Sequence, residues 1–463
     1  MSVVQQEPIA AIATAVGESA IAIVRMSGAG VLNIADKVFR KAGKKPFSFL
    51  NAPSHTAHYG YVVDSRGEWV DEAMAIVYRS PRSFTMEDVV EFNCHGGVVA
   101  TQTVLETLLD AGCRLAQAGE FTRRAFLNGR IDLVQAEAIG EMIHAKTHAA
   151  YRAALAHLKG DLSKKLSALR DDLLNACAML ELELDFSEED VEFQSRDELR
   201  AKMRELKSNL IELADSFKLG KLVQEGAKTA IVGKPNAGKS TLLNALLGKE
   251  RAIVSDVAGT TRDYIEESFA IDGVLFKLID TAGLRPTLDQ IESEGIRRSY
   301  EKIEEADLIL YLVDASTPVD ADEINAIRAL KERNPDAKFL LALNKIDKGV
   351  KAELSLADIE TVKISALARE GIADLKRKMK ALALGAATLS EGSLMLTSLR
   401  HYEAIRNALQ SLEQAETQLR LNAPTELIAF DLRDALNHIG AITGQVTTDD
   451  VLNLIFSRFC IGK

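Results

Sequence analysis

One octapeptide constrains the fold of this chain more than any other feature of its sequence. Residues 233–240, GKPNAGKS, fit the pattern G-x-x-x-x-G-K-[ST]. They follow a short apolar run at 228–232 and precede a helical stretch at 240–247. In that setting consecutive backbone N–H groups line an anion-binding nest at a helix N-terminus, and the glycines let the backbone approach phosphate closely. The octapeptide therefore predicts a phosphate-binding loop within an α/β domain.

The pattern on either side of the loop supports such a domain. Short apolar runs alternate with helical stretches, which is typical of βαβ units and a mostly parallel sheet. The runs lie at 228–232, 276–279, 308–313, 339–343 and 361–364. The residues around Asp272-Gly273 are an exception, because this dipeptide joins the runs 264–271 and 274–279 and predicts a hairpin with one antiparallel strand.

Three segments predict contacts to phosphates and Mg²⁺. Lys239 of the loop can neutralise β- and γ-phosphate charge, and the Ser240 hydroxyl can ligate Mg²⁺. In the segment 280–283, DTAG, the carboxylate can hold a Mg²⁺-bound water and the glycine amide can contact the γ-phosphate. The segment 259–261, GTT, lies between the loop helix and the hairpin, where we expect Thr261 to meet Mg²⁺ as a switch threonine.

Two further segments predict recognition of guanine. The segment 344–347, NKID, ends a strand, and the Asp347 carboxylate can accept both N1–H and the exocyclic amine of guanine, which adenine cannot match. The segment 365–367, SAL, follows the last strand and can offer a backbone amide to guanine O6. Together with the three phosphate segments, in this order at strand ends, they predict a GTP-binding domain.

Helical patterns flank the α/β segment on both sides. Apolar residues recur at three and four over 126–220, no Pro or Gly interrupts 161–219, and a helical pattern returns after the linker at 385–388. We infer that the α/β domain is inserted into a helical domain whose halves pack together; the alternative is two independent bundles. Strand-like runs, with a hairpin around 65–67, fill the N-terminal segment. The predicted fold is a multidomain α+β and α/β protein with domains at 1–125, 126–220, 221–386 and 387–463.

Composition limits the classes of partner. The chain has 56 Lys and Arg against 67 Asp and Glu, a net charge of −11, whereas a protein that relies on attraction to a phosphate backbone is usually basic. The net charge does not exclude a local basic groove that binds a folded RNA. The four cysteines share no C-x-x-C spacing, which predicts reduced thiols. With no signal-peptide pattern and no apolar run near ~18 residues, we expect a cytoplasmic protein without a membrane partner.

The GTP-binding motifs resemble those of Era- and Der-type GTPases, and segments outside the α/β domain narrow the resemblance. These segments are 83–85 (SFT), 87–88 (ED), 95–97 (HGG), 119–122 (GEFT), 124–129 (RAFLNG) and 459–463 (FCIGK). With them, the chain resembles the MnmE (TrmE) family of tRNA-modification GTPases over essentially its whole length.

The resemblance implies a function, cofactors and partners. It implies an N-terminal domain, related to folate-dependent aminomethyltransferases, that forms a homodimer and binds 5-formyl- or 5,10-methylene-tetrahydrofolate. With the FAD- and NADH-dependent MnmG, in a heterotetramer or larger complex, the family adds an aminomethyl or carboxymethylaminomethyl group to C5 of the wobble uridine (position 34) of certain tRNAs. The implied folate contacts are Arg25, Glu91, Arg130 and Lys463. For Arg25 and Glu91 the alternative is an exposed charge on a strand or helix.

Other candidate residues keep two interpretations. Cys460 is either a nucleophile that adds to uridine C6 or a small packing residue of the last helix. His95 is expected to be a turn or core histidine rather than a general base. We expect a basic patch to face the tRNA; the alternative is that these residues form a solvated helix face. The patch consists of Arg123, Arg124, Arg130, Lys159, Lys164 and Lys165.

The resemblance also implies how hydrolysis is catalysed. Leu284 stands where Ras-like proteins have a water-orienting Gln, and the family's substitute falls on Glu292. No arginine finger is identified in cis. Instead, the resemblance implies a K⁺ ion that is bound by Asn236 and by the carbonyls of Ser255, Val257 and Thr260. It also implies that two G domains pair when this ion binds. Alternatively, Asn236 only caps the loop helix.

The complete set of predicted contacts follows from the motifs and the resemblance. The catalytic candidates are Glu292, Lys239 and Cys460, and the Mg²⁺ ligands are Ser240 and Thr261. The predicted GTP contacts are Asn236, Ala237, Gly238, Lys239, Ser240, Thr241, Ser255, Asp256, Val257, Ala258, Gly259, Thr260, Thr261, Asp280, Thr281, Ala282, Gly283, Asn344, Lys345, Ile346, Asp347, Ser365, Ala366 and Leu367.

Two other functions compete with this one. The first is a regulatory RNA-binding GTPase of ribosome assembly like Era. Residues 390–463 argue against it, because they hold six Lys and Arg but nine Asp and Glu and are therefore net acidic. The second is a folate enzyme with a dispensable GTPase, against which the complete set of motifs counts.

Overall fold

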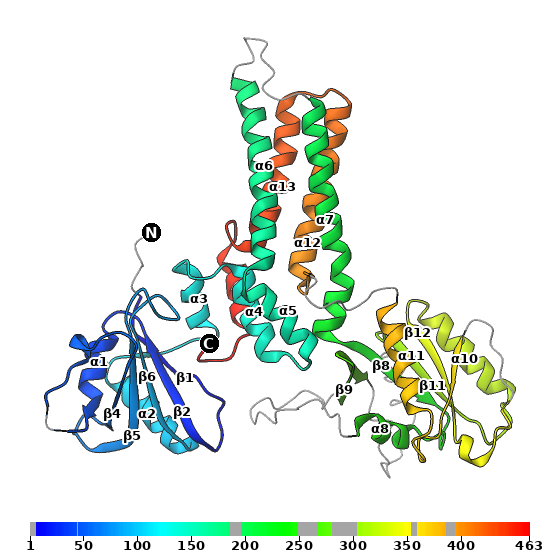
Figure 1. Ribbon diagram of the computed structural model, residues 1–463, viewed down its shortest axis with the longest axis horizontal. Helices are drawn as coiled ribbons and strands as arrows, with labels where there is room; N and C mark the ends of the chain where they lie inside the picture. Colours follow the sequence, from blue (N-terminus) through cyan, green and yellow to red (C-terminus); the bar gives the residue numbers. More distant parts are fainter. Residues whose placement is uncertain are drawn as a thin grey trace.

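The computed structural model describes residues 6–43, 45–185, 196–248, 267–279, 303–352, 359–385 and 394–463. Two sheet-containing domains lie on either side of the base of a long helical bundle (Figure 1). In these ranges no helix combines the length and the apolar character that a membrane crossing requires.

The N-terminal domain is built on a seven-stranded sheet with the order β3-β4-β5-β6-β2-β1-β7. Its elements are β1 (Ile9–Ile12), β2 (Ser19–Ser27), α1 (Val31–Val38), β3 (Phe39–Lys41), β4 (Thr56–Val63), β5 (Trp69–Tyr78), β6 (Val89–Gly96), α2 (Val98–Asp110) and β7 (Arg114–Leu115). Neighbouring strands are antiparallel except β1 and β7, and β4 and β5 form the hairpin predicted around residues 65–67.

The two faces of this sheet differ in character. Val24 and Met26 of β2 belong to the apolar core that α1 and α2 cover. Because successive strand residues point to opposite faces, Arg25 lies on the other face, directly opposite Glu91 of β6 in the register. The alternation of β2 thus places charged side chains on the face that the two helices leave open.

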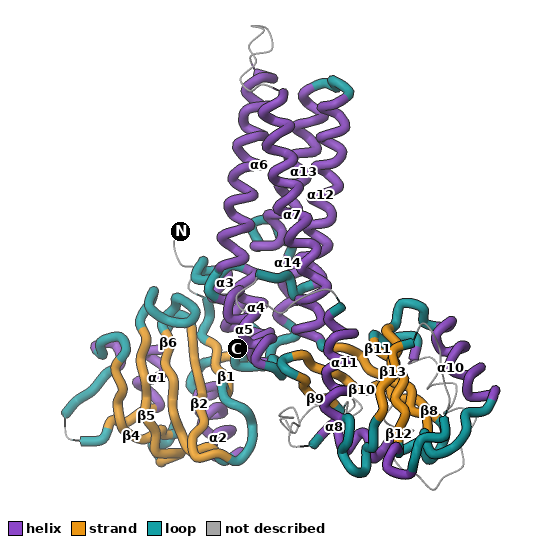
Figure 2. Tube along the Cα trace, turned by 45° about the vertical axis from the view of Figure 1, so that its right-hand side comes forward, coloured by secondary structure: helices purple, strands orange, loops and turns teal. Residues whose placement is uncertain are grey.

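The helical domain is assembled from two stretches of chain that are far apart in sequence. The first contributes α3 (Glu120–Leu127), α4 (Leu133–His144), α5 (His148–Leu158), α6 (Asp161–Asp185) and α7 (Arg196–Glu225), and the second α12 (Leu399–Arg420), α13 (Thr425–Thr443) and α14 (Asp449–Phe456). One apolar core joins α6 and α7 to α12 and α13, which run side by side in both views (Figures 1 and 2). The predicted discontinuous helical domain is therefore confirmed, and the alternative of two independent bundles is wrong.

A buried carboxylate connects the two stretches at the base of the bundle. Glu137 of α4 accepts hydrogen bonds from the Arg400 guanidinium (3.0 and 2.9 Å) and lies 2.6 Å from His401 Nε2, both on α12. Burial by itself would raise the pKa of Glu137, but the charges and hydrogen bonds of His401 and Arg400 outweigh it and bring the pKa to about 2. Glu137 is therefore ionised in the folded chain at neutral pH.

The inserted α/β domain contains a six-stranded sheet with the order β13-β12-β11-β8-β10-β9. Its elements are β8 (Ala227–Gly233), α8 (Lys239–Leu247), β9 (Ser268–Ile271), β10 (Val274–Ile279), β11 (Leu308–Asp314), α10 (Ala321–Arg333), β12 (Lys338–Asn344), β13 (Glu360–Lys363) and α11 (Ile372–Leu384). All pairs are parallel except β9 with β10, and positive φ angles at Asp272 and Gly273 fit the predicted hairpin turn. α8 and α11 pack on one face of the sheet and α10 on the other.

Candidate functional site

The predicted phosphate-binding loop lies between β8 and α8. Gly238, at the N-cap of α8, has a left-handed backbone (φ 98°), and no side chain caps the helix. Asn236 is exposed, also with a left-handed backbone (φ 64°), so the alternative that it caps the helix is wrong. Lys239 Nζ donates hydrogen bonds to the carbonyls of Gly233 (2.7 Å) and Lys234 (3.1 Å), and burial lowers its pKa. The ammonium group is thus held across the loop, beside the amides that would receive phosphate.

Asn344, at the end of β12, connects the phosphate loop to the loop after β13. Its buried side chain donates from Nδ2 to the Ala237 carbonyl (2.8 Å) and accepts at Oδ1 from the Ala366 amide (2.9 Å). A Cβ on Gly238 would lie 2.3 Å from Asn344 Nδ2. Gly238 is therefore required both by its positive φ and by the approach of Asn344.

Two contacts arrange the remaining residues of the NKID segment. Ser365 Oγ donates to Asp347 Oδ1 (2.5 Å) and accepts from the Ala368 amide (3.1 Å), which orients the exposed Asp347 carboxylate. Lys345 Nζ lies 2.6 Å from the carboxylate of Asp314, the last residue of β11. Burial alone would raise the pKa of Asp314, but the hydrogen bonds from Lys345 and Ser316 lower it.

The structure brings three of the predicted nucleotide segments together at the carboxyl edge of the sheet: the phosphate loop, 344–347 and 365–367. Sequence reasoning missed Asp314, although its position at the end of a core strand is a usable signal. Twelve predicted residues lie outside the described part of the chain: Ser255, Asp256, Val257, Ala258, Gly259, Thr260, Thr261, Asp280, Thr281, Ala282, Gly283 and Glu292. Their roles stay predictions.

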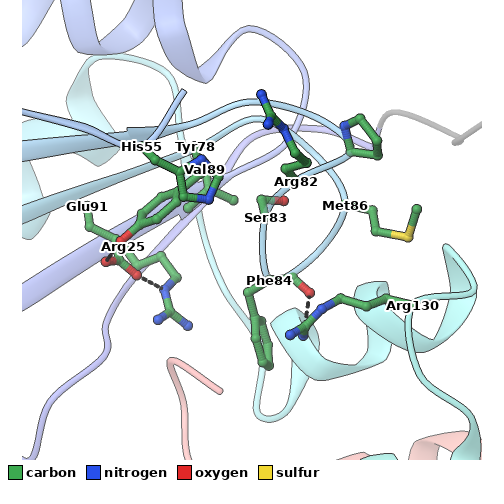
Figure 3. A pocket seen from close by; sticks show the side chains of 11 residues that line it. Arg25, His55, Tyr78, Arg82, Ser83, Phe84, Met86, Val89, Glu91 and Arg130 are labelled. Atoms are coloured by element: carbon green, nitrogen blue, oxygen red, sulfur yellow. Dashed lines mark hydrogen bonds and ion pairs between the residues drawn. The ribbon is translucent and has the colours of Figure 1, made fainter. Parts of the chain in front are cut away.

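A second site lies on the open face of the N-terminal sheet. A cavity of about 660 Å³ is lined by Arg25, His55, Tyr78, Pro81, Arg82, Ser83, Phe84, Met86, Val89, Glu91 and Arg130 (Figure 3). It contains three of the four side chains for which folate contacts are implied, Arg25, Glu91 and Arg130. The sequence analysis assigned none of the other eight to a site, although Ser83 and Phe84 belong to the segment 83–85 that supports the resemblance; five of the eight lie in the irregular segment between β5 and β6.

Charge and aromatic contacts define the chemistry of this cavity. Arg25 Nε lies 2.7 Å from Glu91 Oε1, and the Tyr78 hydroxyl donates to Glu91 Oε2 (3.3 Å). Burial and the charge of Glu91 raise the pKa of Tyr78. Phe84 lies between two guanidinium groups, with its ring centroid 5.4 Å from Arg25 and 4.9 Å from Arg130. The cavity therefore combines cationic donors, one carboxylate and an aromatic wall.

The C-terminal segment runs beside the start of α3. The Phe121 amide donates to the Lys463 carbonyl (3.2 Å), and Ala118 pairs with Ile461 in an antiparallel bridge. Burial and then the charge of Arg25 lower the pKa of Lys463, which places Lys463 within electrostatic reach of the cavity. Cys460 is exposed and follows the end of α14, so the interpretation that it packs in the last helix is wrong.

Two other expectations are corrected by burial. His95 is neither in a turn nor in the core: it lies on β6 with an exposed side chain, 2.6 Å from Asp71, whose hydrogen bond raises its pKa. Arg124 is only 1% exposed and pairs with Glu87 and Glu120, so it cannot face a tRNA. Lys165 of the expected patch is partly exposed and pairs with the exposed Glu212 (3.1 Å), and its role stays a prediction.

Comparison with known proteins covers the whole chain. Residues 8–130 match the family model described as the GTP-binding protein TrmE N-terminus, and residues 133–460 match the MnmE helical domain. The tRNA modification GTPase MnmE of Chlorobaculum tepidum is 57% identical over 98% of this chain and 97% of its own. The proteins of the same name from Chlorobium phaeobacteroides (56%, covering 100% and 98%) and Salinibacter ruber (45%, covering 99% and 100%) are similar over the same extent. This chain belongs to the MnmE family of tRNA modification GTPases.

Proposed function

We propose that this chain hydrolyses GTP to drive modification of wobble uridine in tRNA, together with a partner of the MnmG type that uses FAD and NADH. The product would carry an aminomethyl or carboxymethylaminomethyl group on C5 of uridine 34, and the one-carbon unit would come from tetrahydrofolate. The observation that carries the proposal is the presence of two separate sites in one chain: the nucleotide loops and the charged cavity of the N-terminal domain. We place this activity in the cytoplasm.

The cavity suits a reduced folate in size and in donor set. Its volume of about 660 Å³ falls within the range of small-molecule sites. Glu91 can accept hydrogen bonds from the amide and amine edge of a pterin, and Arg25, Arg130 and Lys463 supply positive charge for the glutamate carboxylates. When bound, the folate supplies the one-carbon unit; the chain's own residues orient it.

The phosphate loop suits Mg²⁺ and a monovalent cation. Ser240, in the first turn of α8, carries the hydroxyl expected to ligate Mg²⁺ together with Thr261. Asn236 has an exposed side chain on a left-handed backbone, and its carbonyl can contribute to a K⁺ site. We propose that K⁺ there, with the carbonyls of Ser255, Val257 and Thr260, stabilises the negative charge that builds up during hydrolysis and favours pairing of two G domains in the homodimer.

Mass spectrometry of wobble uridine tests the function. A strain that lacks the gene is complemented with wild type, with Asp347→Ala in the nucleotide site, with Glu91→Gln in the cavity, or with Thr101→Val on α2 as the control. We expect the modified nucleoside with wild type and Thr101→Val only. Full modification with Asp347→Ala would favour a folate enzyme with a dispensable GTPase. Normal uridine 34 modification in the strain without the gene would favour a role like that of Era.

A further inference from the structure

Among the sequence motifs outside the nucleotide site, two regions pack against each other. They are the segments 83–88 and 119–129, which lie about 30 residues or more apart in the chain. The structure brings them together in a buried cluster: Thr85 and Glu87 have no exposed surface, and Arg124 is 1% exposed. Ionisable groups are rarely buried to this extent unless they are paired, so the cluster calls for a structural or functional reason.

Glu87 is the centre of this cluster. Its Oε2 accepts from Ser27 Oγ (2.7 Å) and from Arg124 Nη1 (3.1 Å). Ser27 Oγ also lies 2.7 Å from Thr85 Oγ1, and Asn128 Nδ2 donates to the Thr85 carbonyl (2.7 Å). The segment 83–88 is thus tied on one side to β2 and on the other to α3.

The pairing continues outward as a chain of alternating charges. Arg124 Nη2 lies 2.9 Å from Glu120, Glu120 lies 2.7 Å from Arg114, and Arg114 lies 2.7 Å from the exposed Glu7. Burial would raise the pKa of Glu120, but the hydrogen bonds from Arg114, Gln117 and Arg124 bring it to about 2. Arg124 can reach Glu87 because Gly28 beside it has no side chain: a Cβ there would lie 3.0 Å from Arg124 Nη1 and 2.6 Å from the Glu7 carbonyl.

This cluster lies directly behind the N-terminal cavity. Ser27 shares a sheet face with Arg25, two residues earlier on β2. Phe84, which precedes Thr85, forms the aromatic wall between Arg25 and Arg130 (Figure 3). Arg130 follows α3, and its Nη1 donates to the Phe84 carbonyl (3.0 Å). A shift of the segment 83–88 or of α3 would therefore move both the wall and a cationic group of the cavity.

We infer that Glu87 and Arg124 are positioning residues for the ligand of the N-terminal cavity: their buried pair holds the segment 83–88 so that Phe84 stays between Arg25 and Arg130. The choice of ligand rests on the proposed function, but the inference about Phe84 rests on the contacts above.

A double-mutant cycle on the full-length chain separates positioning from general stability. The probe is 5-formyl-tetrahydrofolate, and its Kd is measured by calorimetry for wild type, Glu87→Gln, Phe84→Leu and the double variant. Because Glu87→Gln keeps the shape but removes the charge that Arg124 pairs with, we expect binding about tenfold weaker. If Glu87 acts through Phe84, adding Glu87→Gln to Phe84→Leu should cost no further affinity. An equal loss in both backgrounds, or none in either, would overturn the inference.

Two controls keep the test informative. Thr101→Val removes a buried hydroxyl of α2, which donates to the carbonyls of Gly97 (2.9 Å) and His95 (3.2 Å) on the covered side of the sheet, and should leave the Kd unchanged. Should Glu87→Gln fail to fold, Ser27→Ala removes two hydrogen bonds of the cluster but leaves the ion pair, and should weaken binding in the same direction.

Hydrogen exchange of the free protein separates this inference from the proposed ligand. Amides of 83–88 should exchange faster in Ser27→Ala and Glu87→Gln than in wild type and Thr101→Val. If wild type does not bind the folate but exchange increases in this way, the proposed ligand is wrong while the anchoring of the segment is supported. If exchange in 83–88 is the same in all four proteins, the cluster does not hold the segment and the inference is overturned.

Discussion

Replacement of Asn344 by alanine should weaken nucleotide binding because its side chain holds two loops of the site together. Asn344 is buried and joins two loops of the site, through the Ala237 carbonyl at 2.8 Å and the Ala366 amide at 2.9 Å. In Asn344→Ala both backbone groups lose their partner, and the phosphate loop is no longer tied to the loop that should contact guanine O6.

The magnitude follows from the two hydrogen bonds. A buried polar group left without a partner costs about 1–3 kcal/mol. Taking the lower value for each of the Ala237 carbonyl and the Ala366 amide, the site conformation loses about 2 kcal/mol, which corresponds to an affinity about 30-fold lower.

Calorimetry of the full-length chain with GDP and with IDP measures this effect. Because Asn344 positions both loops, we expect Asn344→Ala to weaken both nucleotides to a similar degree. The matched control is Asn334→Ala: Asn334, at the C-terminal end of α10, donates to the carbonyls of Ile303 (3.0 Å), Glu304 (3.2 Å) and Ala306 (3.0 Å), at the sheet edge opposite the nucleotide loops. It should lower stability but not affinity. An unchanged Kd for GDP in Asn344→Ala, or an equal loss in Asn334→Ala, would refute this reasoning.

Four further predictions concern recognition, hydrolysis and stability. Asp347→Ala should lose GTP affinity without unfolding, because its carboxylate is expected to pair with two donors of guanine; calorimetry that shows normal GTP binding would contradict this role. Glu292→Ala should still bind GTP but lose most of its turnover, and a wild-type single-turnover rate would remove Glu292 from the mechanism. GTP hydrolysis should be much faster in K⁺ than in Na⁺ at equal ionic strength, with the difference abolished in Asn236→Ala; equal rates for wild type in the two salts would exclude the cation site. The folded-state pKa of Glu137 is about 2, below its ordinary value of 4.5. At pH values above 4.5 the ionised carboxylate should therefore contribute about 3 kcal/mol to the free energy of unfolding, and this contribution should be lost as the pH falls from 4.5 towards 2. The difference in unfolding free energy between wild type and Glu137→Gln, measured with urea, should therefore shrink on acidification, and a constant difference would show that the pairing with Arg400 and His401 does not depend on charge.

The nucleotide site was predictable because its chemistry is local in sequence. The octapeptide 233–240 carries its own strand–loop–helix context, and motifs that end parallel strands must meet at one edge of the sheet. The hairpin at Asp272-Gly273 and the discontinuous helical domain were predictable for a related reason, since turn residues and apolar periodicity depend on near neighbours. The local sequence pattern did not show that Asn344 links two loops, because its partners, Ala237 and Ala366, are 107 and 22 residues away in the chain.

The N-terminal site depended on contacts that no single segment carries. The sequence by itself determined that a motif at 119–129 exists, and the resemblance named Arg25 and Glu91 as site residues, although the local pattern left open whether Glu91 lies on a strand or on a helix. Only the tertiary structure decided that Arg124 is buried against Glu87 instead of facing solvent, and that Phe84 stands between Arg25 and Arg130. An arginine has the same local pattern whether it is solvated or paired; the outcome depends on whether strands and helices distant in sequence bring a carboxylate within hydrogen-bonding distance and exclude water from the pair.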